Sequence, residues 1–289
     1  MLRRQRTILK LLSTAAGALP ATQLQKYIFL LREETFINHD STFYEFVPYR
    51  FGPYSFAAQR EIETLTAYGY VESAGSSLRI TALGRNEASK VDAETSRAVL
   101  GVVSNYGEKS LKSLLKDVYA RYPSFAFNSE LEGLIPAGTT KPKTAPVAIY
   151  TIGYENRSVD GFLDSLVRAG IRRIIDVRAN PVSRKYGFAR STLARLAGKL
   201  GLGYSHFPEL GISSDRRKEA KTHSEFMELF TYYERQVLPA RMAETAKLAE
   251  LMKAAPSVLL CMEKEAVDCH RGRLATRMAS LTNLSLVHL

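Results

Sequence analysis

Apolar residues recur at helical spacing near the start of the chain, and Gly17 and Pro20 interrupt the pattern. The spacing predicts two helices within residues 5–38. Their apolar stripes are Ile8, Leu9, Leu11 and Leu12, and Leu24, Tyr27, Ile28 and Leu31. The basic and apolar start has the composition of a secretory signal, but its one-sided stripe favours a helix of the domain core.

The next segments predict a third helix and a hairpin. Residues 43–55, FYEFVPYRFGPYS, contain two prolines and a glycine, so we expect no regular element there. Ser55 is expected to cap a helix over 56–68. Short β-rich runs at 70–72 and 78–81 flank a turn of small residues. Three helices followed by a hairpin predict a winged helix.

The motifs FGPYS, GYVE, LRITALGR and SLKSLLKDVYARYP, in this order, resemble a winged-helix family of antitoxin and regulator modules. The resemblance covers about residues 5–130 and implies DNA binding. Such domains also serve as protein-protein adaptors. In that case the aromatic residues of this region, Tyr44, Phe46, Tyr49 and Tyr54, would belong to the core.

After residue 132 the pattern changes. Residues 133–146, with three prolines and two glycines, predict a linker between domains 1–132 and 147–289. Beyond it, strands alternate with helices, which is typical of a doubly wound, mostly parallel α/β domain. The expected strands are 147–152, 172–178, 203–207, 258–261 and 285–288, and the expected helices are 158–169, 191–200, 223–235, 239–254 and 270–280.

Charge and cysteine content indicate the kind of partner and the cellular compartment of the protein. The 40 Lys and Arg residues exceed the 29 Asp and Glu residues, so the net charge is +11 and polyanionic partners are favoured. Two cysteines make no disulfide framework, which favours a reducing compartment, the cytoplasm. The chain lacks an apolar run long enough to span a membrane, so we expect no membrane partner.

Polar residues gather after three predicted strands, where α/β sheets bind ligands. The blocks TIGYENRS, IDVRANPVSR, YSHFPELG, LLCMEKEAVDCHR and a final hydrophobic-Val-His resemble the domain-of-unknown-function family 488 over about residues 147–289. This chain has Tyr154 where the family usually has histidine, and Met262 where it usually has alanine. The site implied by the resemblance is Gly153, Asn156, Arg157, Ser158, Asp176, Arg178, Pro181, Glu209, Cys261, Glu263, Cys269, His270 and Arg271. The resemblance implies no established reaction.

The cysteines and the neighbouring histidine allow three interpretations. Adjacent Cys269 and His270 have poor geometry for chelation, so with Cys261 we expect no metal site and no cofactor. A thiolate at Cys269 beside Arg271 would be nucleophilic, but no anion-cradling loop separates the two. The interpretation we favour is that both cysteines pack the strand-to-helix turn.

Carboxylates follow two apolar strands and must be paired or functional. Asp176 and Glu263 could form salt bridges with Arg178 and Arg271. Alternatively, each could activate water or stabilise positive charge on a sugar. On the second interpretation, Asp176→Asn and Glu263→Gln abolish activity and leave the fold intact.

A basic segment surrounds the candidate site. Residues 168–199 contain nine Lys or Arg and one acid, and Arg216, Arg217 and Lys218 extend the charge in an expected mobile loop. The aromatic residues Tyr186 and Phe188 beside these charges suit stacking on a flipped base.

These features predict an enzyme that acts on DNA, without a metal, by hydrolysing the N-glycosidic bond of a modified base, with phage defence as one setting. The expected catalytic residues are Asp176, Glu263 and His270. The expected substrate-binding residues are Tyr154, Asn156, Arg157, Ser158, Arg178, Arg184, Lys185, Tyr186, Phe188, Glu209, Cys269 and Arg271. The partner would be duplex DNA, and winged helices often form homodimers. The alternative is a winged-helix transcriptional regulator that senses a ligand.

Overall fold

The computed structural model describes residues 1–15 and 17–289, without the side chain of Ser214. The chain forms two compact units, Met1–Lys141 and Pro142–Leu289. The boundary falls inside segment 133–146, where the sequence predicts a linker. Among the described residues, no helix has the length and apolar character needed to cross a membrane.

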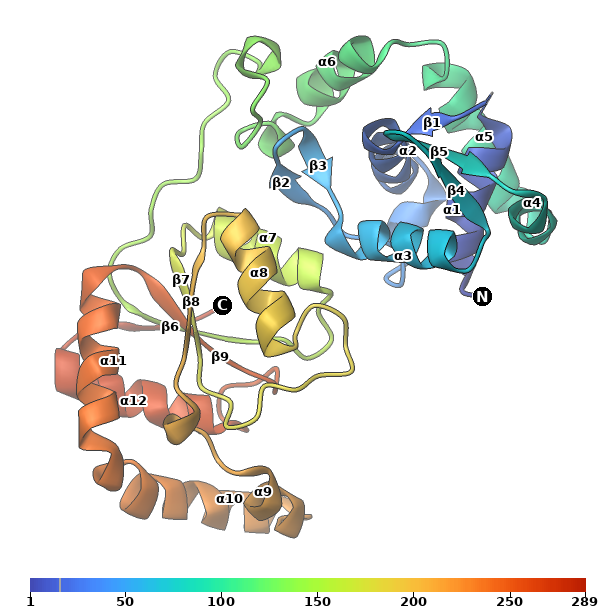
Figure 1. Cartoon of the computed structure of the whole chain (residues 1–289). Helices are drawn as coiled ribbons and strands as arrows, with labels where there is room; N and C mark the ends of the chain where they lie inside the picture. The colour runs from blue at the N-terminus through green and yellow to red at the C-terminus, as the bar shows by residue number, and fades with distance from the viewer. Residues whose placement is uncertain (16) are drawn as a thin grey trace. The chain divides into compact units, whose positions relative to one another are not determined.

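The N-terminal unit consists of helices around a small antiparallel sheet (Figure 1). Its α-helices are α1 (Arg3–Thr14), α2 (Ala21–Glu34), α3 (Phe56–Ala67), α4 (Ala82–Ala88), α5 (Ala93–Tyr106) and α6 (Leu111–Arg121). Its strands are β1 (Leu19–Pro20), β2 (Val47–Tyr49), β3 (Gly52–Tyr54), β4 (Val71–Ala74) and β5 (Ser77–Ile80). Short 3-10 helices span Phe36–His39, Pro123–Phe125 and Glu132–Leu134.

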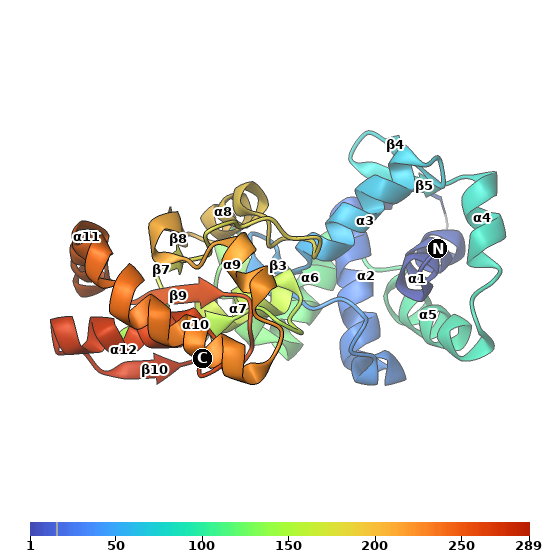
Figure 2. The same cartoon turned by 90° about the horizontal axis from the view of Figure 1, so that it is seen from below.

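The apolar stripes predicted for the first two helices are confirmed. All eight of their side chains are buried in the core of this unit. In Figure 2, α1 lies against both α4 and α5, and these contacts help to bury the apolar side chains of α1. The start of the chain is therefore part of a folded domain, as the one-sided pattern predicts.

The predicted third helix and hairpin are also confirmed, with Ser55 accepting a hydrogen bond from the Ala58 amide at the start of α3. Strands β4 and β5 pair antiparallel, and β1 adds to the other edge of β5. The expectation that 43–55 has no regular element is wrong. Strands β2 and β3 form a three-residue ladder in which Pro48 faces Pro53, and a two-stranded edge ladder tolerates proline.

The C-terminal unit is built on a five-stranded parallel sheet of order β10-β6-β9-β7-β8 (Figure 1). Its strands are β6 (Ile149–Gly153), β7 (Arg173–Asp176), β8 (Gly203–His206), β9 (Ser257–Cys261) and β10 (Leu286–His288). Its α-helices are α7 (Val159–Arg168), α8 (Arg190–Lys199), α9 (Ser214–Glu219), α10 (His223–Tyr232), α11 (Met242–Ala254) and α12 (His270–Thr282). The remaining helical turns are Pro208–Leu210 and Pro239–Arg241, which are 3-10, and Tyr233–Val237, which is a π-helix.

Both faces of the sheet are buried. Ile149, Ile175 and Leu259 share a core with residues of α11 and α12, which pack against each other. Alternation along the strands sends Ile174 and Val258 to the opposite face, and both are also fully buried. A parallel sheet buried on both faces agrees with the α/β class predicted from the sequence.

One segment differs from the expected loop. Residues 214–219, which hold Arg216, Arg217 and Lys218, form the short helix α9. Arg217 is anchored in the site described below, because its guanidinium pairs with a carboxylate 46 residues further along the chain.

Candidate active site

The site lies where β9 ends and α12 begins. Cys261 is the last residue of β9, and Cys269 is the N-cap of α12 in an extended backbone conformation. His270 is the first residue of that helix. The loop between these elements carries Glu263. The parallel sheet places this loop at the carboxyl ends of its strands, as the sequence predicts.

The loop passes unusually close to β6. A Cβ atom added at Gly153 would lie 1.8 Å from the carbonyl oxygen of Glu263. Arg271 is 2% exposed, and its Nη1 and Nη2 donate to the carbonyl oxygens of Glu263 and Lys264 at 2.5 and 2.8 Å. Glycine on one side and a buried guanidinium on the other therefore fix the backbone of the loop.

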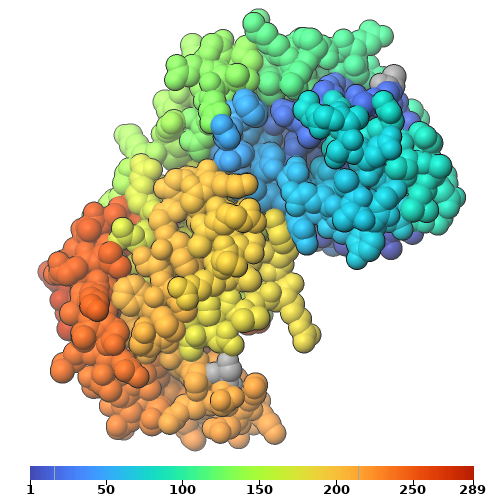
Figure 3. Space-filling model, viewed as in Figure 1, coloured from blue at the N-terminus to red at the C-terminus, as the bar shows by residue number. Residues whose placement is uncertain are grey.

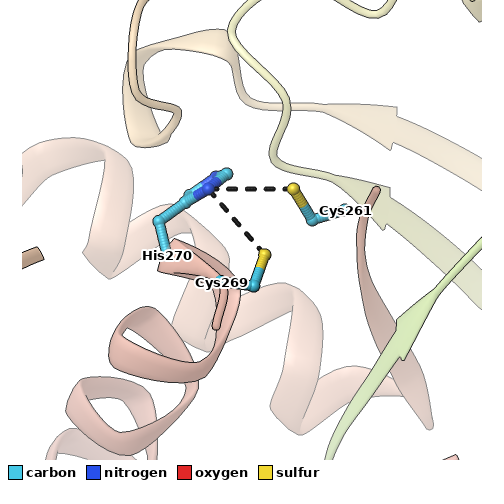
Figure 4. A group of neighbouring side chains, drawn as sticks. All are labelled: Cys261, Cys269 and His270. Atoms are coloured by element: carbon cyan, nitrogen blue, oxygen red, sulfur yellow. Dashed lines mark hydrogen bonds between the residues drawn. The ribbon is translucent and has the colours of Figure 1, made fainter. Parts of the chain in front are cut away.

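Four polar side chains converge inside this frame, three of which are drawn in Figure 4. The Nδ1 atom of His270 lies 3.7 Å from the sulfur of Cys261 and 4.0 Å from that of Cys269. Both thiols donate to Oε2 of Glu263, at 3.2 Å from Cys261 and 2.9 Å from Cys269.

The ligand atoms of Cys261, Cys269 and His270 all lie within 4.8 Å of one another. The expectation that adjacent Cys269 and His270 have poor geometry for chelation is therefore wrong. The extended N-cap residue and the first helical residue have different backbone conformations, so their side chains converge on the end of β9 instead of diverging.

The protonation of the cluster follows from its contacts. The Nε2 atom of His270 lies 3.1 Å from the carbonyl oxygen of Val177, which can only accept, so Nε2 carries the proton of the neutral ring. Burial alone lowers the pKa of His270, but Cys269, the Val177 carbonyl and Glu263 together raise it. Burial raises the pKa of the Cys269 thiol well above its usual value, which disfavours an unassisted thiolate nucleophile.

Glu263 is an ionised carboxylate at neutral pH. Burial would raise its pKa, but the guanidinium of Arg217 and the thiol hydrogen bonds lower it to about 2. The partner differs from the one considered from the sequence, because Arg217 and not Arg271 pairs with the carboxylate. The sequence signal for Arg217 was limited to its membership of a basic run.

A cavity of about 240 Å³ opens beside the cluster. Glu263, Cys269 and His270 form part of its wall, together with Arg217. The remaining lining residues include His223, Phe226, Phe230 and Asp268. The aromatic side chains come from α10, which the sequence predicts as a helix without assigning it a role. A pocket of this kind, apolar with a few converging polar groups, is typical of a ligand site.

Asp176 belongs to a different part of the unit. It is 0% exposed, and its carboxylate accepts hydrogen bonds from Nε and Nη2 of Arg178 at 2.8 and 2.5 Å and from the Tyr204 hydroxyl at 2.5 Å. Ile175 and Val177 lie on the face of β7 toward α12, so alternation places Asp176 on the opposite face. The structure does not bring Asp176 together with Glu263 and His270, and its ion pair with Arg178 matches the structural alternative.

The aromatic residues expected to stack on a base lie in or near the core. Phe188 is 0% exposed, and its ring stacks on that of Tyr154 with centroids 4.3 Å apart. The Arg178 guanidinium lies 5.1 Å from the centre of the Tyr154 ring. Tyr186 is half-buried. In this conformation neither ring of the stacked pair offers a free face.

The remaining predicted binding residues are spread along loops. Ser158 accepts a hydrogen bond from the Gly161 amide and caps α7. Arg157 donates to Ser165 and to the carbonyl of Leu289, both at 3.4 Å. Asn156, Arg184, Lys185 and Glu209 are exposed, and Asn156 has a positive φ of 59°.

A comparison with curated proteins found no match to this chain. Residues 158–278 match the family model described as Domain of unknown function DUF488. The match confirms the resemblance over most of the C-terminal unit and leaves residues 1–157 and 279–289 outside it. The C-terminal unit is therefore similar to the DUF488 family over these residues, and the description of the family gives no function.

Proposed function

We propose that this protein acts on DNA, and that its C-terminal unit hydrolyses a bond in the DNA, with the N-glycosidic bond of a modified base as the first candidate. The observation that carries the proposal is the ionised carboxylate of Glu263 in the wall of an aromatic-lined cavity. A carboxylate in this position can activate water or stabilise positive charge developing on a sugar.

The distribution of charge favours DNA contact by the C-terminal unit. Residues 142–289 contain 23 Lys and Arg against 15 Asp and Glu, whereas residues 1–141 contain 17 against 14. Seven cations of segment 168–199 are exposed: Arg168, Arg172, Arg184, Lys185, Arg190, Arg195 and Lys199. The yellow part of Figure 3, which holds much of this segment, lies on the surface of the unit. Exposed cations attract phosphate groups.

The N-terminal unit is proposed to be a winged helix. The order of α1, β1, α2, α3 and the hairpin β4-β5, with β1 paired to β5, supports this assignment. The charges on α3 do not favour a DNA-reading helix, because Arg60 pairs with Glu63 and Glu61 pairs with Arg4. This observation favours a protein-binding adaptor as the role of the N-terminal unit.

Base release from DNA tests the proposed reaction. Purified protein is incubated with normal and base-modified bacteriophage DNA, and alkali-dependent breaks are measured on a gel. We expect breaks on one DNA type with the native chain, and none with Glu263→Gln. The matched control is Glu265→Gln, because Glu265 lies in the same loop and its side chain is 64% exposed.

Each outcome of this assay has a meaning. Breaks that persist in Glu263→Gln would contradict the assignment of the carboxylate. Intact DNA with a mobility shift would instead favour the second candidate, a regulator in which the cavity holds a small ligand. Intact DNA with no shift at moderate salt would exclude both roles on DNA and leave the adaptor.

A further inference from the structure

The second chemical feature of the C-terminal unit is the thiol and imidazole cluster itself, which the proposed hydrolysis does not use. Cys261 and Cys269 are the only cysteines of the chain, and both are buried beside the imidazole of His270. We propose that Cys261, Cys269 and His270 bind a zinc ion, and that the fourth position of the ion faces Glu263 and the cavity.

The distances fit a tetrahedral ion. Zinc lies about 2.3 Å from thiolate sulfur and about 2.0 Å from imidazole nitrogen, so tetrahedral angles place sulfur and nitrogen ligands about 3.5 Å apart. The Nδ1 atom of His270 lies 3.7 Å from one sulfur and 4.0 Å from the other. An ion between the three atoms therefore needs little movement of the side chains.

The surroundings of His270 match those of a metal ligand. Its Nε2 donates to the Val177 carbonyl, so the lone pair of the neutral ring is on Nδ1, which faces both sulfurs (Figure 4). Histidine ligands usually donate their second ring nitrogen to such an acceptor, which fixes the tautomer and the ring orientation. Tyr233 packs edge-on against the same imidazole, with ring centroids 5.6 Å apart.

The binding step balances as follows. One Zn²⁺ ion binds the two sulfurs and Nδ1, and the two thiol protons leave to solvent, so the ion with its two thiolates is neutral. A neutral centre is compatible with burial, since it adds no net charge to the interior. The carboxylate of Glu263 then loses the two thiol hydrogen bonds and keeps its ion pair with Arg217.

The fourth position is what distinguishes this site from a closed structural one. Cys269, His270 and Glu263 line the cavity of about 240 Å³, so the ion is reached from that side. Three protein ligands with an open position are typical of catalytic zinc, which holds a water and lowers its pKa. A carboxylate beside that water would act as its acceptor for a proton. The metal site rests on its own ligands and does not depend on the proposed reaction.

The test measures metal and thiols in the full, untagged chain. We expect one zinc ion per chain, and two reactive thiols that appear only after a chelator removes the ion. Replacement by Co²⁺ should give the sulfur-to-cobalt absorption and visible bands of a tetrahedral thiolate site. Because both cysteines belong to the cluster, the thiol count reports on this site alone.

The zinc affinity of point variants distinguishes the proposed metal ligands from other residues that line the cavity. Cys269→Ser and His270→Ala should lower zinc affinity at least about tenfold. His223→Ala is the matched control, since His223 lines the same cavity outside the ligand group and should keep its zinc. Glu263→Gln should also keep zinc, because the proposed site has three ligands.

Three results would overturn the site. These are a chain that neither contains nor takes up Zn²⁺ or Co²⁺, two cysteines isolated as a disulfide, and zinc retained in both ligand variants. Loss of zinc in Glu263→Gln would overturn the open fourth position. None of these measurements depends on enzymatic activity. If the chain binds zinc but leaves DNA intact, the proposed reaction is refuted and the proposed metal site still stands.

Discussion

Asp176 and Arg178 form a buried ion pair at the end of β7, with Oδ1 and Oδ2 of the carboxylate 2.8 and 2.5 Å from Nε and Nη2 of the guanidinium. The Arg178 side chain is 5% exposed and that of Asp176 is 0% exposed. Burial alone would lower the pKa of Arg178, but Asp176 raises it, so the guanidinium stays charged. A pair of this kind holds the loop after β7 in place.

The first prediction revises the expectation that Asp176→Asn leaves the fold intact. The substitution leaves the Arg178 charge buried without its partner, so we expect a loss of about 3 to 5 kcal/mol in the free energy of unfolding. Urea unfolding measures it. Asp215→Asn is the control, because Asp215 pairs with Lys218 at the surface and its loss should cost less than about 1 kcal/mol. Equal stability of the two variants would refute the structural role of Asp176.

The second prediction concerns the close approach of the Glu263 loop to β6. Gly153→Ala places a methyl group against the Glu263 carbonyl, so we expect a loss of about 1 to 3 kcal/mol and a displaced loop. Gly198→Ala in α8 is the matched control, since a Cβ there meets nothing within 4 Å. It should stabilise the chain by about 0.4 to 1 kcal/mol. Two variants with unchanged or equally changed melting temperatures would be inconsistent with this packing.

The third prediction is a pH dependence of stability in the N-terminal unit. Lys26 is 1% exposed, and its Nζ donates to the Pro53 carbonyl at 2.6 Å. Burial lowers its pKa to about 7 from 10.5. Between these values the unfolded chain binds more protons than the folded one, so the free energy of unfolding rises with pH. Below pH 7 both states are protonated, and this contribution becomes constant.

Urea unfolding at pH 7, 8 and 9 tests this titration. The native chain should gain up to about 1.4 kcal/mol per pH unit relative to Lys26→Met, which does not titrate. Taking the difference between the two proteins at each pH cancels the contributions of the other groups. A difference that stays constant from pH 7 to pH 9 would show that Lys26 keeps an ordinary pKa.

The fourth prediction concerns the exposed cations of segment 168–199. If the proposed DNA contact is correct, Arg184→Ala combined with Lys185→Ala should weaken binding uniformly across sequences. The slope of log affinity against log salt should fall by about 2, because each phosphate contact contributes about 1. Arg241→Ala with Lys247→Ala removes the same charge from exposed positions around α11 and serves as the control. Titration of labelled duplex at several salt concentrations measures both. If the two double variants have equal salt slopes, Arg184 and Lys185 do not contact the DNA.

Local patterns determined most of the elements of this protein. The helical stripe of α1, the cap at Ser55, the hairpin β4-β5 and the alternation of strands and helices after residue 147 all follow from spacing and propensity within a few residues. The family resemblance also picked out the residues of the Cys261–Arg271 segment. These features depend on neighbours in sequence, so a sequence determines them directly.

The tertiary structure decided which of those residues meet. Asp176 and Glu263 follow parallel strands in the same way, yet the pleat sends Asp176 to the opposite face and pairs it with Arg178. Arg217 reaches Glu263 across 46 residues, and the aromatic wall of the cavity comes from α10. The extended N-cap at Cys269 turns two adjacent ligands toward one point. Local sequence therefore predicts the elements and the candidate side chains, whereas long-range packing selects the ones that form a site.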